Sequence, residues 1–157
     1  MSSRRVFWSA FAAAAVWILD RASKAAAVRG LSSSQSVSIA DPWLAFTLNH
    51  NTGAAFGLGA HIPGGLTIFA TILTLFLAFW WLRSVMRGQG PAVETLALAL
   101  ILGGSAGNLF DRYFYGAVID FIDFKVWPIF NVADIAITSG AVLWAGRVIL
   151  GKREAAS

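Results

Sequence analysis

Four long apolar runs divide the chain and predict four membrane-spanning helices. The runs cover about residues 6–24, 66–82, 93–110 and 132–150, and a helix needs about 20 residues to cross the hydrocarbon core of a bilayer. The first run is uninterrupted only to Leu19, and we expect its helix to continue past Asp20 with Lys24 on the same face. The pattern predicts one membrane domain, residues 1–157, of mainly α class.

Two polar segments, about residues 25–65 and 111–131, connect these helices on one side of the membrane. In the first, residues 36–40 alternate polar and apolar side chains, and residues 43–48 are rich in strand-forming types. Asp41-Pro42 between them is a turn signal. We therefore predict a small β-sheet lying on the membrane.

Composition supports the membrane assignment. The chain is 57% hydrophobic and 13% charged, whereas a soluble domain carries about 25% charged residues. Seven basic residues lie on the side of the two termini and five on the other side, which favours cytoplasmic termini and extracytoplasmic connecting segments. The seven are Arg4, Arg5, Arg83, Arg87, Arg147, Lys152 and Arg153. The basic residues occur in ones and twos without a patch, so no nucleic-acid partner is expected.

The start of the chain leaves a second interpretation open. A basic beginning, an alanine-rich apolar run and following small residues also resemble a cleavable signal peptide. Cleavage would leave three spans and separate Asp20 and Lys24 from the rest of the protein.

Two aspartates stand in apolar, aromatic-rich sequence and are the main candidates for chemistry. They are Asp120, in Val118-Ile-Asp-Phe-Ile122, and Asp134, just inside the last apolar run. An ionisable group at the edge of hydrocarbon is costly and usually faces a cavity. Two adjacent carboxylates cannot both ionise easily, and a pair that shares one proton can perform aspartyl hydrolysis.

Each aspartate also has a simpler interpretation. Asn131 and Asp134 have the spacing of a helix cap with an acid in the first turn. Asp120 could be a solvated loop acid. If residues 117–121 are extended, Asp120 shares a face with Val118 and Ile122, and its competitor Asp123 points to the other face.

Further polar residues cluster near the ends of the predicted helices. Asn108 and Arg112 are four apart and share a helix face, where they could hold a substrate carbonyl or a lipid headgroup, or Arg112 could form a local salt bridge at the helix end. Gly103 and Gly107 have the spacing of close helix packing. The i,i+4 pair Asp20 and Lys24 fits an ion pair at the membrane surface as well as a functional one.

The sequence lacks the residue patterns that other kinds of catalytic site require. The chain has no cysteine, and its two histidines, His50 and His61, are not spaced as metal ligands. Ser105 has no candidate base in the sequence, and we expect no metal and no cofactor. The segment 51–57, Asn51-Thr-Gly53 and the four residues after it, has two glycines, which suit either a tight turn or backbone that approaches a ligand closely.

Taken in order, these motifs resemble the bacterial lipoprotein signal peptidase (signal peptidase II) family over about residues 6–150. The resemblance implies four helices of the bacterial inner membrane with a small extracytoplasmic sheet. It implies an aspartyl endopeptidase that cleaves diacylated prolipoproteins before the lipidated cysteine, in contact with membrane lipid and inhibited by globomycin. It assigns the catalytic pair to Asp120 and Asp134. The motifs are Asp20 with Lys24, Asn51-Thr-Gly53, Gly104-Ser-Ala-Gly-Asn108, Asp111-Arg112, Val118-Ile-Asp120 and Asn131-Val-Ala-Asp134.

By the same resemblance, Asp20, Lys24, Asn51, Gly53, Asn108, Asp111, Arg112 and Asn131 support the site or bind substrate. One departure is that the segment 124–129, between the two aspartate motifs, is shorter than the family leads us to expect. From the residues alone, two alternatives remain: a small transporter or channel with Asp120 and Asp134 as a proton or cation relay, and a lipid-binding scaffold without catalysis.

Overall fold

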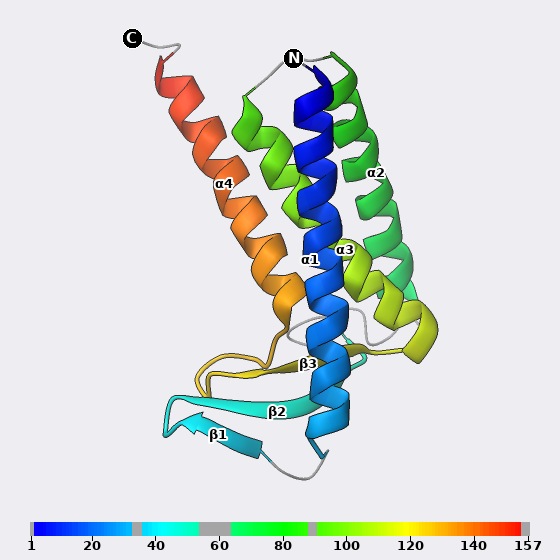
Figure 1. Ribbon diagram of the computed structural model, residues 1–157, viewed down its shortest axis with the longest axis vertical. Helices are drawn as coiled ribbons and strands as arrows, with labels where there is room; N and C mark the ends of the chain where they lie inside the picture. The colour runs from blue at the N-terminus through cyan, green and yellow to red at the C-terminus, as the bar shows by residue number, and fades with distance from the viewer. Residues whose placement is uncertain (1, 33–35, 54–63, 88–90, 155–157) are drawn as a thin grey trace.

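A computed structural model describes residues 2–32, 36–53, 64–87 and 91–154 of the chain. Within these ranges the protein is a helical bundle with a small sheet at one end (Figure 1). The helices are α1 (Ser2–Gly30), α2 (Gly65–Arg87), α3 (Ala92–Tyr115) and α4 (Val132–Glu154). The strands are β1 (Ser36–Ala40), β2 (Leu44–Asn51) and β3 (Val118–Asp123).

Each of the four helices is long and apolar enough to cross a membrane. The predicted fold class is therefore confirmed, although the helices extend beyond the predicted spans. α1 continues to Gly30 and α3 to Tyr115, past the polar residues Asp20, Lys24 and Asp111, which are buried inside the protein. The start of α1 and the end of α4 lie at the same end of the bundle, opposite the sheet (Figure 1).

Small residues let α3 lie at the centre of the bundle, against α1 and α4. A Cβ atom added at Gly103 would lie 2.5 Å from the backbone oxygen of Ala13 in α1. At Gly104 it would lie 2.5 Å from the backbone oxygen of Ala133 in α4. At Gly107 it would collide with the carboxylate of Asp20. The close packing predicted for Gly103 and Gly107 is confirmed, and it brings the polar ends of α1, α3 and α4 together.

The three strands form an antiparallel sheet in the order β1-β2-β3. The predicted turn at Asp41-Pro42 joins β1 to β2, and the peptide bond between these two residues is cis. Asn49 of β2 pairs with Asp120 of β3, so the central strand, β2, runs beside this candidate catalytic residue. Residues around 117–121 are extended, as considered above.

Two tight connections place β3 between α3 and α4. Gly116 ends α3 in the left-handed conformation, at φ 72°, which glycine adopts without the steric cost that other residues meet. After β3 the chain turns back, and Phe130 forms a bridge with Ile122. The short segment 124–131 therefore returns directly to the start of α4, and Asp120 and Asp134 come to the same end of the bundle.

Candidate active site

Asp120 is buried in the sheet, with 1% of its surface exposed. Its Oδ2 accepts a hydrogen bond of 3.0 Å from the side-chain amide of Asn51, and its Oδ1 accepts one of 2.7 Å from that of Asn131. The interpretation of Asp120 as a solvated loop acid is wrong. Both donors are neutral amides, which hold the carboxyl group without fixing its charge by an ion pair.

Asp134 lies in the first turn of α4, and Asn131 precedes that helix. The backbone N–H of Asp134 donates to Asn131 Oδ1 (3.0 Å), and the backbone N–H of Asn131 donates to Asp134 Oδ2 (3.2 Å). These reciprocal bonds form a capping box, so the predicted cap is present. The other carboxylate oxygen, Oδ1, accepts a 2.9 Å bond from the side chain of Asn108, and the capping role leaves this oxygen available for other contacts.

Two buried asparagines connect the two carboxyl groups. The Nδ2 of Asn131 donates to Asp120 and also to Asn108 Oδ1, at 3.1 Å. The Nδ2 of Asn108 in turn donates to Asp134. A hydrogen-bonded path therefore runs from Asp120 to Asp134 through the side-chain amides of Asn131, just before α4, and Asn108 of α3.

A cavity of about 250 Å³ opens on both aspartates. A water molecule occupies about 30 Å³ in the liquid, so the space is large enough for water together with part of a larger molecule. Its lining combines polar side chains with apolar residues from the short segment before α4. The lining residues are Asn51, Gly53, Asn108, Arg112, Val118, Asp120, Trp127, Pro128, Ile129, Phe130 and Asp134.

Burial raises the pKa of Asp120 from 3.8 to about 6. The negative charge of Asp134 acts in the same direction, whereas the bonds from Asn51 and Asn131 and the charge of Lys24 oppose the increase. Asp120 therefore exchanges its proton near neutral pH, as a residue in acid–base chemistry needs to do.

Asp123 has a different environment. Its carboxylate accepts bonds from Thr47 Oγ1 (2.8 Å) and from the backbone and ammonium groups of Lys125 (2.9 and 2.7 Å). The contact with Lys125 is the main reason that the pKa of Asp123 lies below its ordinary value. Asp123 is not among the described residues that line the cavity.

A buried ionic cluster lies beneath the two aspartates. The ammonium group of Lys24 contacts Asp20 Oδ2 at 2.9 Å, Asp111 Oδ2 at 2.7 Å and Asn108 Oδ1 at 2.9 Å. Lys24, Asp20 and Asp111 are fully buried, so the interpretation of Asp20 and Lys24 as a surface pair is wrong. The pair is buried because Gly107 makes room for Asp20 and because Asp111 supplies a second negative charge.

The cluster also ties together the elements that carry the site. Asp20 accepts a 3.0 Å bond from the backbone N–H of Ala133 at the start of α4. Asp111 accepts a 3.2 Å bond from the backbone N–H of Ile119 in β3 and forms an ion pair with Arg21. The sequence analysis did not identify Arg21 as a site residue, because no local spacing links it to Asp111, which lies far along the chain. These two hydrogen bonds hold the backbone at Ala133, next to Asp134, and at Ile119, next to Asp120.

Arg112 lines the cavity and has no ion-pair partner among the described residues. Its Nη1 lies 3.5 Å from the backbone oxygen of Asn108. The local salt bridge considered for Arg112 at the end of α3 is therefore absent from the described part of the chain, because Asp111 turns toward Arg21 and Lys24 instead. A guanidinium group remains in the wall of the cavity, next to two carboxyl groups.

Asn51 is oriented by the residues that follow β2. Its Oδ1 accepts a 3.1 Å bond from the backbone N–H of Gly53, which directs the amide hydrogens toward Asp120. Residues 54–57 of this segment and His61 lie outside the described residues. The sequence analysis also did not identify Trp127 to Phe130 as cavity-lining residues. The aromatic and proline residues in this segment, next to the aspartate motifs, were the signal that could have indicated this role.

Fold and site together define an integral membrane protein with two hydrogen-bonded carboxyl groups at a cavity near one end of its bundle. A family model described as Signal peptidase (SPase) II matches residues 12–150. The chain belongs to this family and is a peptidase.

Relatives and solved structures agree with this membership. The lipoprotein signal peptidase of Syntrophomonas wolfei is 43% identical over 154 residues, which cover 94% of this chain and 96% of that protein. The corresponding protein of Alteromonas mediterranea is 40% identical over 137 residues, covering 83% and 74%. A bacterial membrane enzyme solved by the in meso method at 2.3 Å is similar with a TM-score of 0.78 and 28% identity, over 94% of this chain and 89% of that one. The family predicted from the sequence motifs is confirmed.

Proposed function

We propose that this protein removes signal peptides from diacylglyceryl-modified prolipoproteins by aspartyl hydrolysis, cutting before the lipidated cysteine. The observation that carries the proposal is the connection of Asp120 and Asp134 through Asn131 and Asn108 at one cavity. Membership of the signal peptidase II family supports the choice of substrate.

In the proposed mechanism, the two aspartates share one proton. The ionised carboxylate accepts a proton from a water molecule in the cavity while the water oxygen attacks the scissile carbonyl carbon. The protonated carboxyl group donates to the carbonyl oxygen, and a tetrahedral diol forms. The C–N bond then breaks as the nitrogen of the leaving amine takes up a proton from the pair. Because the titrating proton belongs to the pair, neither residue is its permanent holder.

The pKa of Asp120 supports a mechanism with one protonated and one ionised carboxyl group. A value of about 6 allows a protonated and an ionised form to coexist near neutral pH. Neutral amide donors suit such a pair, since an ion-paired arginine or lysine on each carboxylate would keep both ionised. Arg112, in the cavity wall, is suited to bind a substrate carbonyl or the lipid headgroup through its planar set of donors.

Lys24 acts as a positioning residue in this proposal. Its bond to Asn108 Oδ1 allows only one orientation of the amide, with Nδ2 toward Asp134. Asn131 donates to the same oxygen, so the orientation is fixed twice. The buried ammonium group thereby fixes the donor to one aspartate without contacting substrate.

The site lies at the sheet end of the bundle, and we place that end at the extracytoplasmic face of the inner membrane with both termini in the cytoplasm. The excess of basic residues at the other end supports this orientation. Reporter fusions after Trp43 or Lys125 should report the extracytoplasmic side, and fusions after Gly88 or at the C-terminus the cytoplasmic side. The opposite pattern would refute the orientation, and a mature N-terminus near residue 25 would refute the four-span arrangement.

Incubation of the purified protein with a diacylated prolipoprotein tests the function. Mass spectrometry should show loss of the signal peptide immediately before the modified cysteine, and an unlipidated substrate with serine in place of that cysteine should stay intact. Globomycin should block cleavage, and chelators and serine-directed reagents should not. Failure to cleave the lipidated substrate would contradict the assigned function, and full inhibition by a chelator would contradict the aspartyl mechanism.

A further inference from the structure

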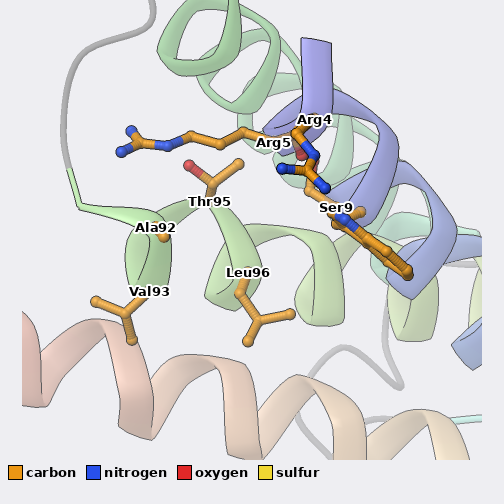
Figure 2. Close-up of a pocket in the computed structure, with 8 residues that line it drawn as sticks. Arg4, Arg5, Ser9, Ala92, Val93, Thr95 and Leu96 are labelled. Atoms are coloured by element: carbon orange, nitrogen blue, oxygen red, sulfur yellow. The ribbon is translucent and has the colours of Figure 1, made fainter. Parts of the chain in front are cut away.

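A second cavity lies at the end of the bundle opposite the sheet, between the first turns of α1 and α3 (Figure 2). It has a volume of about 630 Å³, more than twice that of the candidate active site. Figure 2 shows its side chains coming from both helices, above the ribbon of α4. The lining residues are Arg4, Arg5, Trp8, Ser9, Ala92, Val93, Thr95 and Leu96.

The groove exists because α1 and α3 approach closely only further along. Gly103 allows backbone contact with Ala13, but the earlier turns carry the larger residues Trp8 and Leu96. Leu96 is seven residues before Gly103, or about 10 Å along the helix axis. At this end α4 also spreads away from α1 (Figure 1). The cavity lies between the first turns of α1 and α3, which provide all of its described lining residues.

The groove has two chemically different parts. Trp8 and Leu96 are 61% and 42% exposed and form an apolar surface open to the surroundings of the bundle. Arg4 and Arg5 add two positive charges at one end, and none of the described lining residues is acidic. Glu94 lines a neighbouring cavity together with Arg83 and Arg87.

The ends of the candidate membrane spans indicate that the groove lies where lipid headgroups meet hydrocarbon. The candidate membrane span of α1 begins at Arg4, and that of α3 begins at Ala92. Both residues line the groove, so its charged end is at the membrane surface and its apolar part is within the bilayer. An arginine fork binds a phosphate through parallel hydrogen bonds.

We propose that this groove is a binding site for an anionic phospholipid. The phosphate binds Arg4 and Arg5, and one acyl chain lies along Trp8, Val93 and Leu96. The two positive charges select a lipid with a net negative headgroup over a zwitterionic one. The site is distinct from the candidate active site and holds whether or not the proposed cleavage reaction is correct.

Native mass spectrometry of the full-length protein tests the proposal. The protein is released from detergent micelles that contain equimolar phosphatidylglycerol and phosphatidylcholine with identical acyl chains. We expect phosphatidylglycerol to be retained about thirtyfold more than phosphatidylcholine, from the attraction of two arginines. The double variant Arg4→Gln/Arg5→Gln should lose this preference. Ala92→Phe keeps both charges but fills the groove, and it should retain less of either lipid.

The matched control removes the same charge at the same end of the bundle, in Arg83→Gln/Arg87→Gln. It should keep the preference for phosphatidylglycerol. Unchanged lipid retention in Arg4→Gln/Arg5→Gln would overturn the proposal. An equal loss in both double variants would also overturn it, since the attraction would then come from the whole surface. Thermal unfolding in detergent confirms that each variant is folded.

Discussion

Replacement of Lys24 by methionine removes the positive centre of the buried cluster with little change in volume. The ammonium group forms ion pairs with the carboxylates of Asp20 and Asp111 and donates a hydrogen bond to Asn108 Oδ1. In Lys24→Met, Asp111 keeps Arg21 and the N–H of Ile119, and Asn108 keeps Asn131. Asp20 keeps only the N–H of Ala133, so its charge loses its ion-pair partner.

The expected loss of stability follows from the charge of Asp20, which no longer has an ion-pair partner. Removal of one partner of a buried ion pair costs about 3–5 kcal/mol of the free energy of unfolding, whereas an exposed pair contributes at most about 1 kcal/mol. The double variant Asp20→Asn/Lys24→Met restores the net charge of the cluster. It should recover at least about 2 kcal/mol relative to Lys24→Met alone, because the two effects are coupled.

Unfolding by a denaturing detergent in mixed micelles gives the free energies, and cleavage of a diacylated prolipoprotein gives the activity. Both variants should cleave more slowly per folded molecule, because Asn108 has lost one of the two contacts that orient its amide toward Asp134. A loss of stability below about 1 kcal/mol in Lys24→Met would refute the buried cluster. Full activity in the stable double variant would refute the positioning role of Lys24.

Three further outcomes are expected. Arg112→Lys keeps the charge but loses the planar fork, so the cleavage rate should fall at least about tenfold with thermal unfolding unchanged, and near-normal cleavage would mean that the fork is not used. Because the pKa of Asp120 is raised to about 6, its contribution favours the folded state at low pH. That contribution, about 3 kcal/mol, is lost as pH rises from about 4 through 6. Asp120→Asn should lack this decline relative to the wild type, and parallel pH–stability curves would contradict the raised pKa. Gly107→Ala should destabilise the protein by displacing Asp20, whereas Gly146→Ala, with nothing within 4 Å of the added Cβ, should not; equal effects in thermal unfolding would contradict the close packing.

The sequence predicts much of the fold, because its main features are local. Long apolar runs specify the four spans, and strand-forming residues on either side of Asp41-Pro42 specify the first hairpin. The spacing of Asn131 and Asp134 predicts the cap of α4, and the structure has both of its hydrogen bonds. These features depend on neighbours along the chain, so no knowledge of tertiary contacts is needed.

The buried cluster could not be predicted in the same way. The i,i+4 spacing of Asp20 and Lys24 is the same for an exposed and a buried pair. Burial depends on Gly107 and Asp111 of another helix, and the contact from Lys24 to Asn108 spans 84 positions. The pairing of Asp111 with Arg21 instead of a local partner is likewise a tertiary effect.

In the proposed mechanism, Asp120 and Asp134 share the catalytic work and Asp123 takes no part. The most direct test measures cleavage of a diacylated prolipoprotein by the three single variants Asp120→Asn, Asp134→Asn and Asp123→Asn, each checked for folding. The first two should lose cleavage altogether, since an amide can neither share the proton nor activate water, and the third should retain most of it. Cleavage that survives in Asp120→Asn or Asp134→Asn, or that disappears in Asp123→Asn, would contradict the claim.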